Sequence, residues 1–290
     1  MYIFSFLACH SIFAARSFIN DPPVYSYTPV ESGFTSDNEQ DRISIVSTNL
    51  WFSQDVEGLF DEIHRVVPVV DIFILQEVTG KENSQNHNSA FLLAEKHGYH
   101  AVFTPYMNHP NGDVDFGTAI LSRWPIEHAE SLLLPNEHLI WGSQRMATYS
   151  VLKHPYQDIH VISAHLETFY ANLSQHESRK EQVLQLFHFL YNKGSPNDVK
   201  ILAGDFNTFF ESGGLLLEET AEKFGFFDVS QDVDFTYDGL WDMKLDYIFM
   251  NGNSSEDCSL QVLRDISHSD HFPLWLSIKS VDNNNTKQSK

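Results

Sequence analysis

Residues 199–208, VKILAGDFNT, join a short run of aliphatic and β-branched residues to a turn that carries Asp205 and Asn207. The run is typical of a buried strand, and the turn lies where that strand ends. Polar residues of the acid/base or metal-ligand type border strand-like runs elsewhere in the chain too: Asn49 after ISIVST (43–48), Glu77 after DIFILQ (71–76), His165 after IHVISA (159–164), Asp246 within KLDYIF (244–249), and Asp270 with His271 before FPLWLSI (272–278). Because loops at strand ends are where a rigid sheet presents chemistry, these residues are candidates for one site.

Longer segments with helical spacing of apolar residues lie between these runs. They cover residues 54–67, 89–97 and 176–191, and a further strand pattern covers residues 117–121. Strands that alternate with helices predict an α/β domain, a sheet core flanked by helices.

We expect one such domain, over residues 42–280, because the chain contains no internal repeat and no second linker. Residues 17–41 are polar and proline-containing and are expected to form a linker, and residues 281–290 are expected to form a polar tail. Residues 1–16 are apolar up to Arg16, which leaves two alternatives: a signal peptide, or an apolar arm packed on the domain. We favour export, hence a secreted or extracytoplasmic location over a cytoplasmic one. Since no run of 18 apolar residues occurs, no transmembrane segment is expected.

Composition excludes several classes of protein. With 42% hydrophobic residues in 290, the chain can bury a large core, so it is not a disordered protein. Its 18 Lys and Arg against 39 Asp and Glu give a net charge of -21, which excludes coating long nucleic acid with a basic face. Local cleavage of a phosphate ester stays possible where divalent cations bridge enzyme and phosphate. The two cysteines, Cys9 and Cys258, exclude a disulfide scaffold and a cysteine-rich zinc module.

The order of the motifs resembles that of the endonuclease/exonuclease/phosphatase superfamily, which includes deoxyribonuclease-I-like and abasic-site nucleases, neutral sphingomyelinases and inositol polyphosphate 5-phosphatases. The resemblance covers residues 43–278 and implies a four-layer α/β sandwich, in which two mostly antiparallel sheets face each other with helices outside. The matched blocks are STNLW (47–51), LQEV (75–78), GTAILSRWPI (117–126), QRMA (144–147), SAHLET (163–168), LAGDFNT (202–208), LDYIF (245–249) and SDHFPL (269–274).

Hydrolysis of a phosphodiester needs an activated water and neutralisation of the phosphoryl oxygens. Hard oxygen ligands favour Mg²⁺, with Mn²⁺ as a substitute, and the lack of a Cys cluster or His-Glu-x-x-His motif argues against zinc. The resemblance implies these roles: metal ligation by Glu77 with Asn49 and Asp270, general base catalysis by His271 held by Asp246, orientation of water and phosphoryl group by Asp205 and Asn207, donation to a phosphoryl oxygen or the leaving group by His165, and phosphate binding by Arg145. For Arg145 the alternative is a surface ion pair.

One position departs from the family pattern. Abasic-site nucleases have an acidic residue two positions after the first-strand Asn, and Trp51 stands there in this chain. The departure favours fewer carboxylates on the metal. Trp51 and Phe52 either stack on a base or a lipid chain, or pack under a loop, and packing under a loop is the expectation.

The catalytic residues do not choose the substrate, because members of the superfamily act on DNA, RNA, sphingomyelin and inositol phosphates with much the same set. The segment after His165 resembles the corresponding block of the tyrosyl-DNA phosphodiesterase, where an Arg and a Gln follow His-Leu-Glu. We expect a metal-dependent phosphodiesterase, with nucleic acid ahead of a phospholipid or inositol phosphate headgroup as substrate. The alternative of another class is a non-catalytic binding module with the same fold. No protein partner is indicated.

Overall fold

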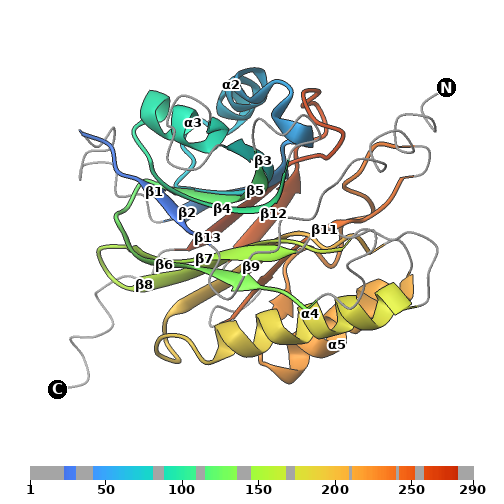
Figure 1. Ribbon diagram of the computed structural model, residues 1–290. Coiled ribbons are helices and arrows are strands. Elements are labelled where there is room, and N and C mark those ends of the chain that lie inside the picture. Colours follow the sequence, from blue (N-terminus) through green and yellow to red (C-terminus); the bar gives the residue numbers. More distant parts are fainter. Residues whose placement is uncertain are drawn as a thin grey trace.

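The computed structural model describes residues 23–30, 42–80, 88–108, 115–135, 145–167, 174–208, 211–239, 242–251 and 258–279. Two β-sheets lie face to face in the middle of the molecule, and a pair of helices covers the outer face of each (Figure 1). The expected four-layer α/β sandwich is therefore confirmed.

The first sheet has seven strands, and its only parallel pair among the described residues is β2 with β3. Its order is β1 (Tyr25–Tyr27), β4 (His100–Asn108), β5 (Asp115–Ser122), β3 (Ile72–Gly80), β2 (Arg42–Asn49), β13 (Leu274–Lys279) and β12 (Cys258–Val262). The second sheet has six strands, of which β8 and β9 are parallel. Its order is β10 (Phe227–Asp228), β11 (Asp246–Met250), β9 (Val199–Asp205), β8 (Asp158–His165), β7 (Met146–Lys153) and β6 (Ile126–Leu133).

Aliphatic side chains fill the space between the two sheets. Ile43 and Ile45 of β2 pack in one buried cluster with Val161 of β8 and Ile201 of β9. Successive strand residues point to opposite faces, so the same strands also supply the two outer cores beneath the helices. Removing this much apolar surface from water is the main force that holds the layers together.

Helices α2 (Val56–Val66) and α3 (Ser89–His97) cover the seven-stranded sheet, and α4 (Ser174–Tyr191) and α5 (Glu211–Lys223) cover the six-stranded sheet. Asp55 caps α2 by accepting a 3.0 Å hydrogen bond from the backbone N–H of Gly58. The three helices expected from apolar spacing are all present, with ends that differ by one or two residues.

Several elements were not expected from the sequence. Strand β4 contains Pro105, which disfavours a strand, and the pairing with β5 shifts register at that position. Helix α5 contains Gly213 and Gly214, which weaken a helical pattern. Strands β6 and β7 pair as neighbours although β6 is largely polar.

The structure differs from the expected linker at Tyr25–Tyr27, which form β1 on β4. The two tyrosine rings pack on the core beneath α2 and α3, and this burial explains why a polar segment joins the sheet. Residues 1–16 and 281–290, with the export signal and the tail expected there, lie outside the described residues. Among the helices of the described part, none has the length and apolar character required to cross a bilayer.

Candidate active site

Three neighbouring strands of the six-stranded sheet bring His165, Asp205 and Asp246 together. The backbone register pairs His165 of β8 with Asp205 of β9, and Asp205 with Asp246 of β11. Since β8 and β9 run parallel and β11 antiparallel, the ends of the first two strands meet the start of the third. The Nε2 atom of His165 lies 3.5 Å from Oδ2 of Asp205. The sheet pairing itself thus builds half of the candidate site.

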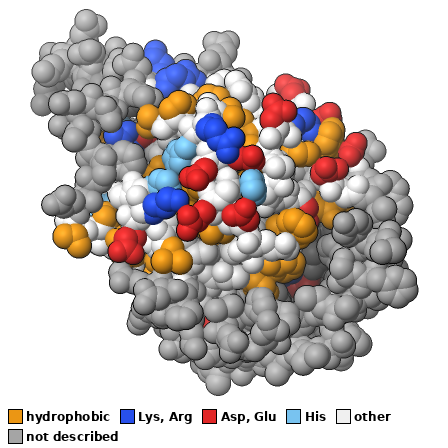
Figure 2. Space-filling model, turned by 90° about the horizontal axis from the view of Figure 1, so that it is seen from above, with side chains coloured by type: hydrophobic (Ala, Val, Ile, Leu, Met, Phe, Trp, Pro, Cys, Tyr) orange, Lys and Arg blue, Asp and Glu red, His pale blue; other side chains and the backbone are white. Residues whose placement is uncertain are grey.

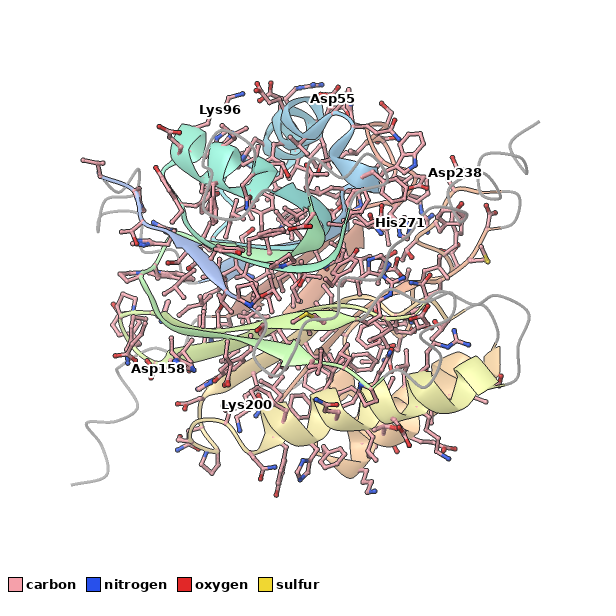
Figure 3. The ribbon with its side chains drawn as sticks, in the orientation of Figure 1. Asp55, Lys96, Asp158, Lys200, Asp238 and His271 are labelled. Atoms are coloured by element: carbon pink, nitrogen blue, oxygen red, sulfur yellow. The ribbon has the colours of Figure 1, made fainter. Side chains whose placement is uncertain are left out.

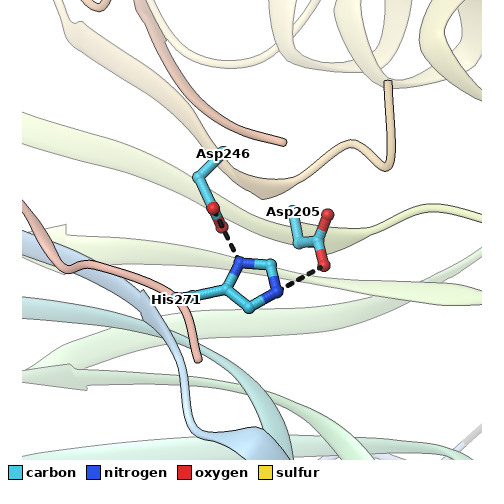
Figure 4. A group of neighbouring side chains, drawn as sticks. All are labelled: Asp205, Asp246 and His271. Atoms are coloured by element: carbon cyan, nitrogen blue, oxygen red, sulfur yellow. Dashed lines mark hydrogen bonds and ion pairs between the residues drawn. The ribbon is translucent and has the colours of Figure 1, made fainter. Parts of the chain in front are cut away.

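The seven-stranded sheet supplies the other half. Asn49, the last residue of β2, donates a 3.2 Å hydrogen bond from Nδ2 to Oδ2 of Asp205 on the facing sheet. His271 precedes β13, and its Nε2 lies 3.9 Å from the same carboxylate oxygen (Figure 4). His271 is at one side of the sandwich where the two sheets meet, far from Asp158 at the start of β8 (Figure 3). Asp205 therefore contacts side chains from both sheets.

His271 and Asp246 form a buried hydrogen-bonded pair. The Nδ1–H of His271 donates to Oδ2 of Asp246 over 2.8 Å, and the hydroxyl of Thr236 donates to the same oxygen over 2.6 Å. This bond fixes the tautomer and leaves Nε2 directed toward Asp205. Burial lowers the pKa of His271, but the carboxylates of Asp246, Asp205 and Asp270 outweigh it and raise the pKa to about 10. The imidazole is thus strongly basic in a field of carboxylates.

Glu77 lies at an irregular point of β3. The pairing of β3 with β5 shifts register between Leu75 and Val78, and Glu77 has a φ of 54°. This bulge aims its side chain at the site edge, where burial and the charge of Asp270 raise its pKa to about 7. Burial also raises the pKa of Asp270, with His271 acting in the opposite direction. Several acidic side chains therefore lie close together at this edge of the site.

The donor set suits a hard divalent cation. Ligand atoms of Asp205, Asp246 and His271 all lie within 4.8 Å of one another. In addition, the buried Oδ1 of Asp246 has no hydrogen-bond partner within the part of the chain that the structure describes. Because Nδ1 of His271 is already bonded to Asp246, the neighbouring oxygen atoms of Glu77, Asn49 and Asp270 fit a cation better than the imidazole does. Oxygen ligands of this kind are typical of Mg²⁺ or Mn²⁺ sites.

Arg145 is buried beside His165 rather than on the surface. It lies over the ring of Tyr106, 5.2 Å from the centroid, and its Nε is 3.7 Å from Oε2 of the buried Glu167. The alternative of a surface ion pair is therefore wrong. Tyr106 Oη and His165 Nδ1 share a 2.9 Å hydrogen bond, and burial together with Arg145 and His271 holds the pKa of His165 well below its usual range. His165 is thus neutral.

Asn207 is held in an unusual backbone conformation, with a φ of 50°. Its N–H donates to Oδ1 of Asp205 over 2.9 Å, and its side-chain Nδ2 donates to the carbonyl of Leu166 over 3.0 Å. Its own carbonyl accepts from Nη1 of Arg179 on α4. Contacts with β9, with the residue that follows β8 and with α4 thus hold Asn207 in place next to Asp205.

The sequence prediction missed three residues that shape the site. Tyr106 was missed because Pro105 hides its strand, and Thr236 because no local pattern marks the partner of Asp246. Arg179 does carry a signal in the sequence, because an Arg and a Gln follow His-Leu-Glu there. In the structure Arg179 bonds Asn207, and Gln182 accepts from the N–H of Glu167.

Trp51 and Phe52 are exposed, with 38% and 39% of their surface accessible, so the expectation that they pack under a loop is wrong. They form a single tight turn, η2 (Trp51–Ser53), which begins two residues after the end of β2 and whose φ values are all positive. The N–H of Trp51 donates to Oδ1 of Asn49 over 3.0 Å, and the N–H of Phe52 donates to Oε2 of Glu77 over 2.9 Å. These two bonds hold the turn at the edge of the site, where both residues stay partly accessible to solvent.

A family model described as the Endonuclease/Exonuclease/phosphatase family matches residues 46–271. The chain belongs to this family, as the motifs predicted. The match spans the strand ends from β2 to His271, and so includes every candidate site residue named above.

Solved structures share the fold at low sequence identity. An endonuclease/exonuclease/phosphatase from Beutenbergia cavernae DSM 12333 is 20% identical, with a TM-score of 0.64 over 83% of this chain and 72% of that one. A D. rerio TDP2 humanized by 14 mutations is 17% identical, with a TM-score of 0.60 over 83% of this chain and 100% of that one. SmcL is 17% identical, with a TM-score of 0.62 over 82% and 99%. No curated protein matches the sequence.

Proposed function

We propose that this protein is a Mg²⁺-dependent phosphoesterase that hydrolyses a phosphodiester with water activated by His271. Membership of the family supports a phosphoesterase. The observation that carries the proposal is the His271–Asp246 pair, whose Nε2 faces Asp205 beside the carboxylates of Glu77 and Asp270. Such a pair can accept a proton, and such a group can hold a cation.

Glu77, Asn49 and Asp270 are the residues that would hold the cation. When bound, Mg²⁺ supplies positive charge that neutralises the phosphoryl oxygens and offsets the carboxylates that make His271 so basic. Asn49 has its side-chain oxygen anchored by Trp51 and its nitrogen by Asp205, so its orientation is fixed in advance. A fixed orientation of this kind is what preorganised sites require.

His271 acts as the general base. Its Nε2 takes a proton from the attacking water, and Asp246 stabilises the resulting imidazolium through Nδ1. Thr236 holds the Asp246 carboxylate from the other side, so the carboxylate cannot rotate away from the imidazole. Asp205, 3.9 Å from Nε2, orients the water.

Asn207, His165 and Arg145 contact the phosphoryl group and the leaving group. Burial lowers the pKa of His165, and its Nδ1 shares a hydrogen bond with Tyr106; with Tyr106 as the donor of that bond, Nε2 of His165 carries the proton that it donates to a phosphoryl oxygen. Arg145 contributes a permanent positive charge, because nearby anions, Glu167 foremost, outweigh the effect of burial and raise its pKa.

Nucleic acid is our favoured substrate. The support is the resemblance of the segment after His165 to the corresponding block of the tyrosyl-DNA phosphodiesterase. In this segment Glu167 pairs with Arg145, Arg179 donates to the carbonyl of Asn207, and Gln182 accepts from the N–H of Glu167. A phospholipid or inositol phosphate headgroup is the alternative, and a non-catalytic binding module is the alternative of another class.

A substrate panel tests the proposal. Strand cleavage of oligonucleotides, headgroup release from phospholipid vesicles and phosphate release from inositol phosphates are measured with Mg²⁺, with Mn²⁺ and with chelator, using His271→Ala as the control for contaminating activity. We expect metal-dependent cleavage of oligonucleotides by the wild type only. Binding of substrates without turnover would favour the binding module instead.

A further inference from the structure

Two large aromatic side chains lie exposed at the edge of the candidate site. Trp51 and Phe52 follow Asn49 by two and three residues, and the two residues are 38% and 39% accessible. Adjoining exposed apolar residues can mark a binding surface. Since single exposed apolar residues need no explanation, the backbone that holds this pair is the decisive observation.

The backbone of the turn is strained. Trp51, Phe52 and Ser53 have φ values of 44°, 57° and 55°, in the left-handed region that bulky residues rarely enter. Such a conformation is unfavourable for a bulky residue and persists only where the surroundings enforce it. Three such residues in succession, none of them glycine, indicate that the aromatic side chains of this turn have a function.

The strain is imposed by the site itself. Trp51 N–H donates to Asn49 and Phe52 N–H donates to Glu77, while Ser53 Oγ donates to the carbonyl of Glu77 and accepts from the N–H of Thr79. Beneath the turn, the ring of Phe52 packs on the buried Phe116, with centroids 5.0 Å apart. The two aromatic residues are therefore anchored to the residues that surround the phosphate position, and Phe52 has a fixed orientation.

We propose that Trp51 and Phe52 form an aromatic platform that stacks on a nucleobase adjoining the scissile phosphate. The inference rests on the proposed phosphodiesterase function and names its substrate as a nucleic acid with at least one unpaired base. Stacking is a suitable source of affinity for this chain, because its net charge of -21 rules out a broad basic surface that tracks the backbone.

A bilayer is the other surface that exposed aromatics could enter, and the charges nearby disfavour it. The segment that follows the turn carries Asp55, Glu57, Asp61 and Glu62, and the first Lys or Arg after Phe52 is Arg65. Interfacial segments gain affinity for anionic lipid from basic side chains, whereas this one would be repelled. These carboxylates also repel the phosphates of a nucleic acid, so the affinity there has to come from the uncharged π-face of a base.

Trp51→Gly provides the test, because glycine adopts a φ of 44° without steric penalty and so removes the ring while keeping the turn. The probes are a short single-stranded oligonucleotide and the same oligonucleotide with abasic spacers in place of its bases. We expect KM for the first to rise on the order of 5- to 100-fold and KM for the second to stay unchanged. Tyr156→Ala removes an exposed ring near the start of β8, away from the site, and should change neither.

Binding of a labelled oligonucleotide to His271→Ala, with and without Trp51→Gly, gives a second readout that is independent of turnover. Equal losses on both probes, or no loss on either, would overturn the platform. If the wild type cleaves both probes equally well, the platform fails while the phosphodiesterase function stands. If Trp51→Gly loses activity on phospholipid vesicles instead, the rings bind lipid and the inference is wrong. Hydrolysis of no phosphodiester would remove the proposed function and this inference with it.

Discussion

The hydrogen bond from Nδ1 of His271 to Oδ2 of Asp246, 2.8 Å long, joins the two sheets of the sandwich. Asp246 opens β11 in the six-stranded sheet, and His271 precedes β13 in the seven-stranded sheet. The pair exists only when the two sheets are packed in the correct relation. The orientation of His271, the proposed general base, is therefore a property of the whole domain rather than of one loop.

Removing the base should abolish most of the activity without unfolding the protein. We expect His271→Ala to reduce turnover by on the order of 10²-fold or more, and Asp246→Asn to be similarly severe because it disturbs both tautomer and charge. His188 is exposed on α4, so His188→Ala is the matched control and should retain full turnover. Near wild-type turnover in His271→Ala would assign the base to another residue.

Glu77→Gln should weaken metal binding. The substitution keeps the shape of the side chain and an oxygen that can accept from Phe52, but it removes the charge. We expect the Mg²⁺ concentration for half-maximal activity to rise on the order of 10- to 100-fold. An unchanged Mg²⁺ requirement would place the metal elsewhere.

The same residue predicts how the metal-free protein responds to pH. The folded-state pKa of Glu77, about 7, lies above its ordinary value, so folding disfavours the ionised carboxylate. This group therefore destabilises the fold increasingly as pH rises from its ordinary pKa through 7. In chelator, Glu77→Gln should be more stable than the wild type at pH 8, and the gap should close toward pH 5. Denaturant unfolding at both pH values measures it, and a gap that widens on acidification would contradict the assignment.

Arg179 is expected to act by positioning Asn207, whose carbonyl accepts from it. Loss of a hydrogen bond from a charged group costs about 1.5–3 kcal/mol, so Arg179→Met should lower kcat on the order of 10- to 100-fold. The Mg²⁺ requirement should not change. Lys180→Met alters the exposed neighbour and serves as the control. Equal effects of the two variants would show that Arg179 has no special role.

The helical layer formed by α2 and α3 should be sensitive to acid. His64 and His97 lie with ring centroids 5.1 Å apart, and burial lowers the pKa of both, while the neighbouring Asp61 acts in the opposite direction. Glu57 and Lys96 are the other charged groups that act on His97. On this face acidic, basic and histidine side chains are interspersed (Figure 2).

Because the folded state disfavours the protonated form of both histidines, their contribution to stability is complete above the ordinary His pKa and is lost as pH falls below it. His97→Phe should therefore lose less stability than the wild type between pH 7 and pH 5. Parallel pH profiles for the two proteins would refute this origin of the acid sensitivity.

The strand ends that form the site could be predicted because buried strands leave a local hydrophobic pattern and the polar residues interrupt it. The order of those interruptions then identified the family and, through it, the four layers. Contacts between distant segments leave no such pattern. Tyr106 was missed because Pro105 argues against a strand, and the hydrogen bond between Tyr106 and His165 depends on how β4 and β8 pack. The exposed turn at Trp51 was mispredicted because bulky residues rarely take left-handed φ values.

Hydrolysis of a phosphodiester by this protein should depend strictly on a divalent cation. The protein is treated exhaustively with chelator, and cleavage of an oligonucleotide is followed while Mg²⁺ or Mn²⁺ is added back, with Glu77→Gln in parallel. We expect no cleavage in chelator, full recovery in the wild type, and recovery in Glu77→Gln only at much higher metal concentration. Undiminished cleavage by the chelator-treated wild type would contradict the claim that the carboxylates around Glu77 hold a catalytic cation.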